Sequence, residues 1–160
     1  MNDDILYGLQ NFDRVWSRVA GGMEAPPSAS RDDEAALREF IADELRDAAF
    51  YSELARRAGW ASRMLRRIAA EETGHKKNLQ TEYFLLTGDS YVAEPSCPAV
   101  SAVLDSMRLA YANEPKGAEC YLAAAEATKS EQLREMYRMH ASDETSHAEA
   151  LRSMISRAIG

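Results

Sequence analysis

Two Glu-x-x-His motifs in this chain have the residue types and the spacing to bind metal ions. Glu72 and His75 form the first motif, and Glu144 and His147 form the second. Residues three positions apart lie on one face of a helix, so the carboxylate and imidazole of each motif can reach the same ion. One such motif is a weak signal in so acidic a chain. Here two of the three histidines carry it, which favours a metal site.

Both motifs lie in an internal repeat. Glu44 is followed seven residues later by Tyr51, and Glu114 is followed seven residues later by Tyr121. The two halves are offset by 70 residues at these glutamates and by 72 residues at the motifs. Each half is therefore predicted to be a helical hairpin that carries one lone glutamate and one Glu-x-x-His.

Four long helices are predicted by apolar residues that recur at intervals of three and four. Glycine and proline separate them, and the predicted ranges are 31–58, 62–86, 98–128 and 131–159. Pro98 would stand in the first turn of the third helix, where its missing N–H costs little. A further amphipathic helix is predicted over residues 4–20. With the Gly/Pro/Ser-rich stretch after it, it forms an N-terminal segment, 1–30, ahead of a bundle domain, 31–160.

The hairpin geometry places the four glutamates at one level of the bundle. Glu44 and Glu72 are 28 residues apart, and Glu114 and Glu144 are 30 apart, with a predicted turn midway in each case. Each arm is about 14 residues, or roughly 21 Å at 1.5 Å per residue. Two antiparallel arms of equal length bring the glutamates of one hairpin to the same height.

The glutamates and motif histidines stand where the helical period calls for buried apolar residues. A buried ionised carboxylate is costly, and four at one level would repel one another and have raised pKa values. Two divalent ions would balance four carboxylates, with two neutral imidazoles completing the set. This is the pattern of di-iron carboxylate bundles, and its donor types suit iron or manganese. A decayed site, or a polar core network without metal, is the alternative.

The chain from about residue 32 to 158 resembles the ferritin-like superfamily, in particular rubrerythrin-type and bacterioferritin-type di-iron proteins. The motifs that carry this resemblance are Glu44-x6-Tyr51, Glu72-x-x-His75, Glu114 and Glu144-x-x-His147. The resemblance implies an all-α four-helix bundle with a long crossover between its second and third helices. It also implies that Glu72 and Glu144 bridge two metal ions. Glu44 and Glu114 would be terminal ligands, and each motif histidine would take one ion.

Several positions depart from these families. Rubrerythrins carry an extra ligand glutamate one turn after the glutamate of the third helix, where this chain has Gly117. The rubredoxin-like Cys-x-x-Cys module of full rubrerythrins is absent. Thr73 stands where bacterioferritin has its haem methionine, so no haem is expected. Pro115, directly after Glu114, should kink the third helix or favour a local bulge.

The resemblance implies a di-iron oxidoreductase. Two iron ions, with manganese as another possibility, would reduce hydrogen peroxide or dioxygen with electrons from an external donor. Tyr51 and Tyr121 could donate protons or electrons near the metals, or hydrogen-bond the ligand carboxylates. One alternative is a ferroxidase for iron handling, with Fe(II) as the substrate. Another is a non-catalytic metal-binding bundle that serves assembly.

Three more polar residues lie close to the motifs in sequence. His140 is one turn before Glu144 on the same inward face. It could be a satisfied core histidine, a group behind the ligands, or a spare ligand. Glu71 and Asp143 lie off the apolar stripe and are predicted to be solvated.

Charge and composition exclude some other classes. The chain has 19 Lys and Arg against 26 Asp and Glu and no dense basic stripe, which argues against a nucleic-acid partner. No apolar run approaches the roughly 20 residues that span a bilayer, and the acidic start is not a signal peptide. Two cysteines without a Cys-x-x-Cys pair favour a reduced, cytoplasmic protein. The apolar stripe of the N-terminal helix suggests a homodimer.

Overall fold

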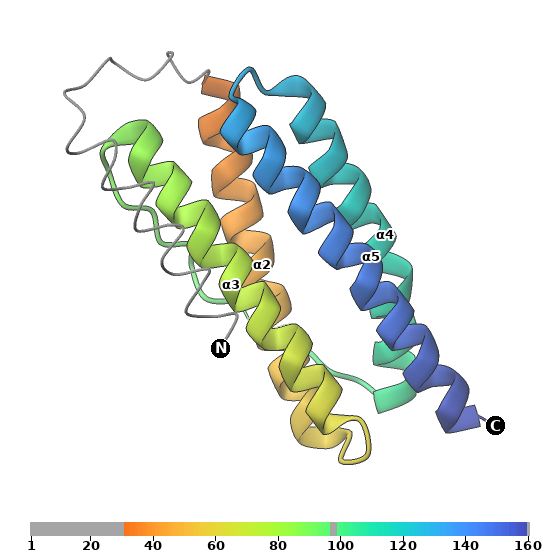
Figure 1. Ribbon diagram of the computed structural model, residues 1–160. Helices are drawn as coiled ribbons and strands as arrows, with labels where there is room; N and C mark the ends of the chain where they lie inside the picture. The colour runs from red at the N-terminus through yellow and green to blue at the C-terminus, as the bar shows by residue number, and fades with distance from the viewer. Residues whose placement is uncertain (1–30, 97–98, 160) are drawn as a thin grey trace, which may run out of the picture.

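The apolar period of the sequence produces four helices in the residues that the structure describes, 31–96 and 99–159. In the computed structural model these helices are α2 (Arg31–Arg57), α3 (Ser62–Thr87), α4 (Val103–Ala127) and α5 (Glu131–Ile159). The described residues contain no strand, and the predicted all-α ferritin-like bundle is confirmed (Figure 1). The helix predicted over residues 4–20 lies outside the described residues. None of the described helices is both long and apolar enough to cross a bilayer.

The helices pack as two antiparallel hairpins, α2 with α3 and α4 with α5 (Figure 1). The first hairpin turns through a short loop in which the N–H of Ala61 donates to the carbonyl of Ala58 at 2.8 Å. The second hairpin turns at Thr128, whose N–H donates to the carbonyl of Ala124 at 3.0 Å. Both turns are short, so each hairpin holds its two helices at a fixed height relative to each other.

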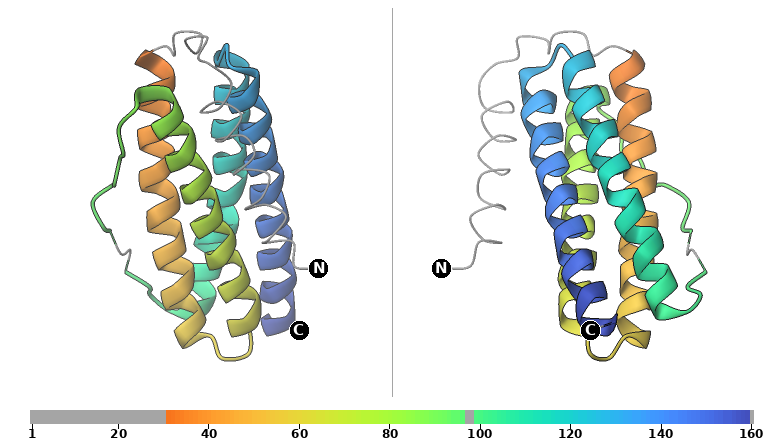
Figure 2. Two further views of the ribbon diagram at one scale, coloured as in Figure 1. Left: turned by 60° about the vertical axis from the view of Figure 1, so that its left-hand side comes forward. Right: turned by 90° about the vertical axis from the view of Figure 1, so that its right-hand side faces the viewer.

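A long crossover joins the two hairpins and runs along the bundle beside α2 (Figure 2). It leaves α3 at Gly88, whose φ of 80° is the left-handed conformation that closes a helix without a Cβ penalty. The side-chain amide of Gln80 donates to the carbonyl of Tyr91 at 2.9 Å, and Arg57 donates to the carbonyl of Val100. The predicted crossover is therefore fixed to α3 by Gln80 and to α2 by Arg57.

The prediction that α4 begins at Pro98 is wrong, because α4 begins at Val103. The crossover must return along α3, whose 26 residues span about 39 Å. Ten residues, 88–97, reach at most about 36 Å even when fully extended. The crossover therefore needs several more residues of extended backbone, and Ala102 is still extended at φ −62° and ψ 138°.

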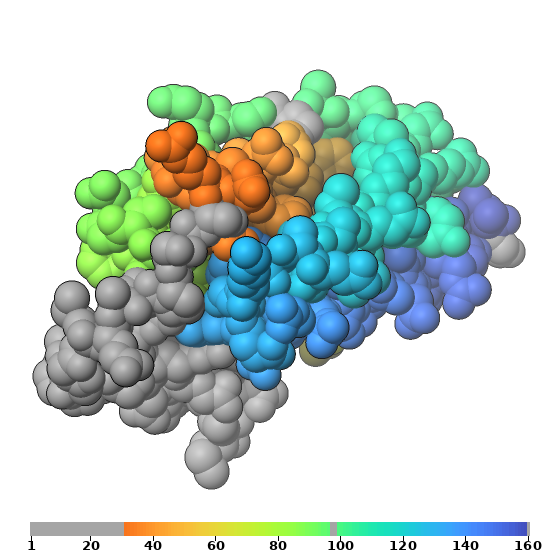
Figure 3. Space-filling view, turned by 90° about the horizontal axis from the view of Figure 1, so that it is seen from above, coloured from red at the N-terminus to blue at the C-terminus, as the bar shows by residue number. Residues whose placement is uncertain are grey.

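Two apolar clusters lie on either side of the bundle's middle. One includes Leu54, Leu65 and Leu151 near the turn between α2 and α3. The other includes Leu37 and Leu133 near the opposite end, where the start of α2 meets the turn between α4 and α5 (Figure 3). Together they exclude water from both ends of the polar centre between them.

Pro115 lies within α4, and the helix continues on both sides of it from Val103 to Ala127. No bulge interrupts α4, so that part of the sequence expectation is not met. Pro115 and Tyr111 are both exposed. The carbonyl of Tyr111, which loses its helical N–H donor to the proline, therefore lies on the solvent side of the helix.

Candidate metal centre

The six predicted ligands converge in the middle of the bundle, one or two from each helix. Their relative exposure lies between 1% and 7%, and they are Glu44, Glu72, His75, Glu114, Glu144 and His147. In each hairpin, residues that are equally far from the turn lie at the same height along the bundle. Ligands that are far apart in the sequence therefore meet at one level.

The donor atoms fall into two groups that share two members. One group, whose donor atoms all lie within 4.8 Å of one another, consists of Glu44, Glu72, His75 and Glu144. The other group, with the same spacing, consists of Glu72, Glu114, Glu144 and His147. Glu72 and Glu144 belong to both groups. This shared membership is what two adjacent ions joined by two bridging carboxylates would require.

Each motif histidine turns one ring nitrogen toward the glutamates and the other toward an acid of the opposite hairpin. Nδ1 of His75 lies 3.1 Å from Glu72 Oε2, and its Nε2 donates to Asp143 Oδ2 at 3.1 Å. Nδ1 of His147 lies 3.1 Å from Glu72 Oε1, and its Nε2 donates to Glu71 Oε2 at 3.0 Å. An imidazole whose Nε2–H is held by a carboxylate presents its Nδ1 lone pair to a metal.

The prediction that Glu71 and Asp143 are solvated does not account for these contacts, although their side chains are 35% and 45% exposed. Both are partly buried, and each orients the histidine of the other half. The sequence did contain a signal, since an acidic residue stands directly before the motif glutamate in both halves. It was missed because these residues lie off the apolar stripe, and only the packing of α3 against α5 brings them to the rings.

The tyrosines of the repeat also act across the two hairpins. The hydroxyl of Tyr51 donates to Glu114 Oε1, and the hydroxyl of Tyr121 donates to Glu44 Oε1. The second oxygen of each glutamate is buried and has no hydrogen-bond partner among the described residues. Each lone glutamate therefore has one oxygen held by a tyrosine and one oxygen available to an ion.

Burial governs the protonation of the carboxyl groups. It raises the pKa of Glu44 and of Glu144 above the usual value, and the charge of Glu72 raises both further. Burial alone would also raise the pKa of Glu72, but its contacts with His147 and His75 hold that pKa below the usual range. Protons on Glu44 and Glu144 thus relieve the repulsion that several buried carboxylates would otherwise create.

The motif histidines respond in the opposite direction. Burial alone would lower the pKa of each imidazole, but the surrounding carboxyl groups raise it above the usual value. The contact with Asp143 raises the pKa of His75 more than any other single contact, and the contact with Glu114 does so for His147. Since a metal ion needs neutral imidazole and ionised carboxylate, ion binding here must displace protons.

These residues fit a metal centre on their own chemistry. Buried and unpartnered atoms among the described residues include Oε2 of Glu44, Oε2 of Glu114 and Nδ1 of His147. A buried polar atom without a partner is costly, and these three are all metal-ligand atoms on residues of the two groups. Two divalent cations, one in each donor group, would satisfy all three atoms.

A cavity of about 370 Å³ reaches the carboxylate side of the centre from between α2 and α4. Glu44, Glu114 and Glu144 contribute to its wall, together with Tyr51 and Tyr121. Gly117 also lines it, and a Cβ at that position would lie 3.6 Å from the Glu144 carboxyl group. The absence of a side chain at position 117 keeps this approach to the carboxylates open.

Asp47 lines the same cavity one turn after Glu44 on α2. Burial, and then the charge of Glu72, raises the pKa of Asp47 to about 7. Around it the rim is charged and exposed, with Arg46 paired to Asp43 at 2.6 Å. Sequence patterns did not single out Asp47, because an acidic residue off the apolar stripe of α2 cannot be distinguished by sequence from a solvated one.

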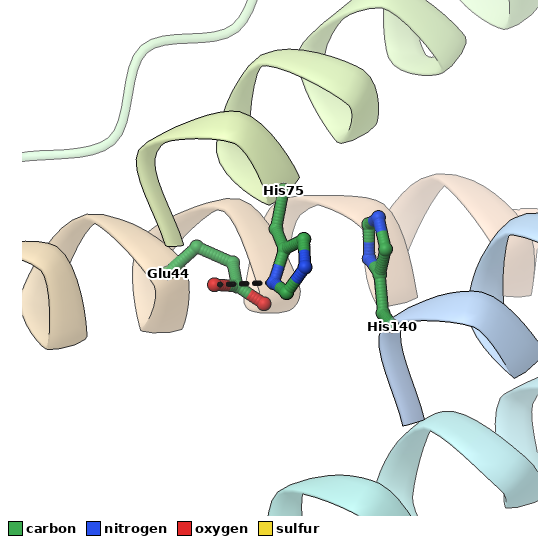
Figure 4. A group of neighbouring side chains, drawn as sticks. All are labelled: Glu44, His75 and His140. Atoms are coloured by element: carbon green, nitrogen blue, oxygen red, sulfur yellow. Dashed lines mark ion pairs between the residues drawn. The ribbon is translucent and has the colours of Figure 1, made fainter. Parts of the chain in front are cut away.

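His140 lies directly beside the centre. Its ring stacks on that of His75 with 4.2 Å between the ring centroids (Figure 4). It is fully buried, and neither ring nitrogen has a hydrogen-bond partner among the described residues. One role that the sequence left open for His140 is a core histidine with satisfied hydrogen bonds. The described residues show no such hydrogen bonds.

Comparisons with known proteins agree with the fold and with a metal site. The family model for rubrerythrin matches residues 105–158, which cover most of α4 and α5. A hypothetical protein from Pyrococcus furiosus has a similar structure, with a TM-score of 0.70 and 24% identity over 78% of this chain and 88% of that chain. At that identity the likeness supports the fold alone. No curated protein matches the chain.

The resemblance to rubrerythrin-type proteins is thus confirmed over the second hairpin, within an all-helical bundle of the ferritin-like kind. The buried carboxylate and histidine groups suit a metal-binding site of that family.

Proposed function

We propose that this protein is a di-iron oxidoreductase that reduces hydrogen peroxide or dioxygen. The observation that carries the proposal is the pair of buried donor groups sharing Glu72 and Glu144. The rubrerythrin match over residues 105–158 supports it, because the second lone glutamate and the second motif both lie in that range. Iron is favoured over softer ions by the excess of carboxylate over imidazole.

In this proposal Glu44 and His75 would hold one ion, Glu114 and His147 would hold the other, and Glu72 and Glu144, which belong to both donor groups, would serve both ions. A bound pair of ferrous ions would supply the two electrons that convert hydrogen peroxide and two protons into two waters. An external donor would return those electrons.

The chain's own residues would admit the substrate and keep the ligands in place. The cavity between α2 and α4 is large enough for peroxide and reaches the carboxylate side of the centre. Tyr51 and Tyr121 hold one oxygen of each lone glutamate at the cavity wall. Burial keeps the pKa of Tyr121 well above its usual value, so its hydroxyl would stay protonated and keep its hydrogen bond to Glu44.

The first experiment is the metal content of protein purified without oxygen, with Glu72→Ala and Glu144→Ala alongside. About two irons per chain in the wild type, lost in both variants, is the expected result, because each substitution removes a ligand common to both groups. Glu119→Ala, an exposed glutamate on α4, is the matched control and should keep its iron. Less than about a tenth of an equivalent, even after loading with Fe(II) or Mn(II), would contradict the proposal.

Ferroxidation is the second candidate, favoured by the acidic residues Asp43 and Asp47 along the cavity that leads to the glutamates. Anaerobic mixing with increasing Fe(II), followed by peroxide, separates the two functions. A reductase stops after about two irons are oxidised per chain until a reductant is added. Continued oxidation of further Fe(II) would show instead that iron is the substrate.

A further inference from the structure

The repeat that builds the metal centre is broken at His140. The offset of 72 residues that relates the two motifs pairs position 140 on α5 with position 68 on α3, which is Ile68. Both side chains are buried, at 0% and 1% exposure. An isoleucine at this position fills the core, so a histidine there is a departure that packing alone does not require.

His140 lies within reach of one half of the centre only. A nitrogen of its ring, a nitrogen of His75 and an oxygen of Glu44 all lie within 4.8 Å of one another. The stacked rings come from different helices, α5 and α3, and the His75 ring lies between His140 and Glu44 of α2 (Figure 4). No comparable third group forms around His147 within the described residues.

The state of the His140 ring favours ligation. Both of its nitrogens are buried and without a hydrogen-bond partner among the described residues, which is an unfavourable state for a polar atom. An imidazole nitrogen without a hydrogen-bond partner can offer its lone pair to a metal ion. In the structure the two rings lie within 26° of parallel, so His140 must turn about its side-chain bonds for its lone pair to converge with that of His75. No hydrogen bond within the described residues opposes that turn.

We propose that His140 is a third imidazole ligand, so that the ion position beside Glu44 and His75 is richer in nitrogen than the position beside Glu114 and His147. The proposal rests on the proposed di-metal centre and adds that its two positions are chemically unequal. Nitrogen donors strengthen binding of the later divalent metals. The position beside His75 therefore fills first and releases its ion last.

The test uses Co(II) as the probe metal with the full-length protein. Proton NMR of the cobalt-loaded protein counts the strongly shifted, exchangeable imidazole N–H signals, one for each coordinated histidine. The chain has three histidines, so three such signals are expected in the wild type and two in His140→Ile. The isoleucine copies the repeat-related residue at position 68 and should be accepted by the core.

Titration of Co(II), followed by its visible absorption, gives a second readout. The first equivalent should bind more tightly than the second in the wild type. His140→Ile should weaken that first step by at least about tenfold and leave the second step unchanged. His140→Gln, which keeps a polar side chain without an imidazole, should behave the same way and serves if the isoleucine variant folds poorly.

Tyr137→Phe is the matched control. Tyr137 lies one turn before His140 on α5, is equally buried, and also has a hydroxyl without a hydrogen-bond partner among the described residues. Its removal changes the buried polar content but no imidazole, so signals and affinities should match the wild type.

The outcomes separate this proposal from the one on which it rests. The wild type could bind two cobalt ions, show only two shifted N–H signals, and titrate as His140→Ile does. That result would overturn the third ligand and leave the di-metal centre intact. Failure of the wild type to bind Co(II) at all would overturn both.

Discussion

At the scale of single residues, the centre is built from contacts between the two halves of the repeat. From the first half, the hydroxyl of Tyr51 donates to Glu114 and the carboxylate of Glu71 accepts from His147, both of which lie in the second half. The reverse pairs, Tyr121 with Glu44 and Asp143 with His75, hold the first half. Neither hairpin has a complete set of ligands and supporting groups on its own, so metal binding and docking of the hairpins depend on each other.

Removing an orienting acid should weaken metal binding although no ligand is lost. Asp143→Ala leaves Nε2 of His75 without its acceptor, so the ring loses the contact that fixes its orientation. We expect the affinity for Mn(II) to fall by about 10- to 100-fold. Equilibrium titration followed by electron paramagnetic resonance measures it. Glu149→Ala, an exposed acid on the same helix, should bind as the wild type does; an unchanged affinity in Asp143→Ala would show that the contact does not support a ligand.

Asp47 should make the metal-free protein less stable as the pH rises. Its pKa is about 7 in the folded chain, well above the ordinary value of 3.8. Between these two values the folded state holds a proton that the unfolded state has lost, so stability falls through this range and then levels off. Asp47→Asn removes the effect and should be more stable than the wild type by about 1–2 kcal/mol at pH 8, with the difference shrinking toward pH 5.

Thermal unfolding of both metal-free proteins at several pH values measures this difference. Asp43→Asn is the control, since Asp43 is exposed and paired with Arg46 at the rim of the same cavity. A constant gap between Asp47→Asn and the wild type from pH 5 to pH 8 would contradict the assignment.

At the scale of the elements, α4 carries features that stabilise it poorly. Pro115 removes one of its hydrogen bonds, and Gly117 adds backbone freedom that must be lost on folding. Both follow Glu114 within one turn. The sequence of this helix thus favours an open approach to the carboxylates over local stability.

Gly117→Ala should stabilise the fold by about 0.5–1 kcal/mol, because alanine is the better helix former. The added Cβ makes only an ordinary contact of 3.6 Å with Glu144. Gly74→Ala on α3, where a Cβ would meet no described atom within 4 Å, is the matched control and should gain a similar amount. Urea unfolding of the two variants measures both. A loss of stability only in Gly117→Ala would mean that the space beside Glu144 does not accept a methyl group.

At the scale of the whole molecule, the centre is where the two hairpins meet through buried carboxyl and imidazole groups. The helix backbones lie closer together within each hairpin than between hairpins, and side chains of both hairpins share the two apolar clusters. Ions bound by both hairpins would add to this packing. The expected homodimer would add contacts outside this centre, and sedimentation of the full chain measures it.

Metal loading should raise the melting temperature strongly. An ion present at about 100 times its dissociation constant adds roughly 2.7 kcal/mol, which corresponds to about 10 °C for a domain of this size. Scanning calorimetry with and without Mn(II) measures the shift. Glu72→Ala should lose most of it, because Glu72 belongs to both donor groups, whereas an equal shift in that variant would place the ions elsewhere.

The sequence by itself determined the four helices and the level at which their ligands meet. Helical period and turn positions are local properties, so they suffice to place Glu44, Glu72, Glu114 and Glu144 inward and at one height. The sequence also indicated the repeat, whose two lone glutamates and two motifs are the residues that the fold brings together.

Only the tertiary structure determined which groups contact and orient each ligand. That Glu71 and Asp143 orient histidines and that His140 stacks on His75 both depend on how one hairpin lies against the other. Such contacts join residues more than 60 positions apart. No local pattern records them, because the same period and the same turns are compatible with many rotations of one hairpin about the other.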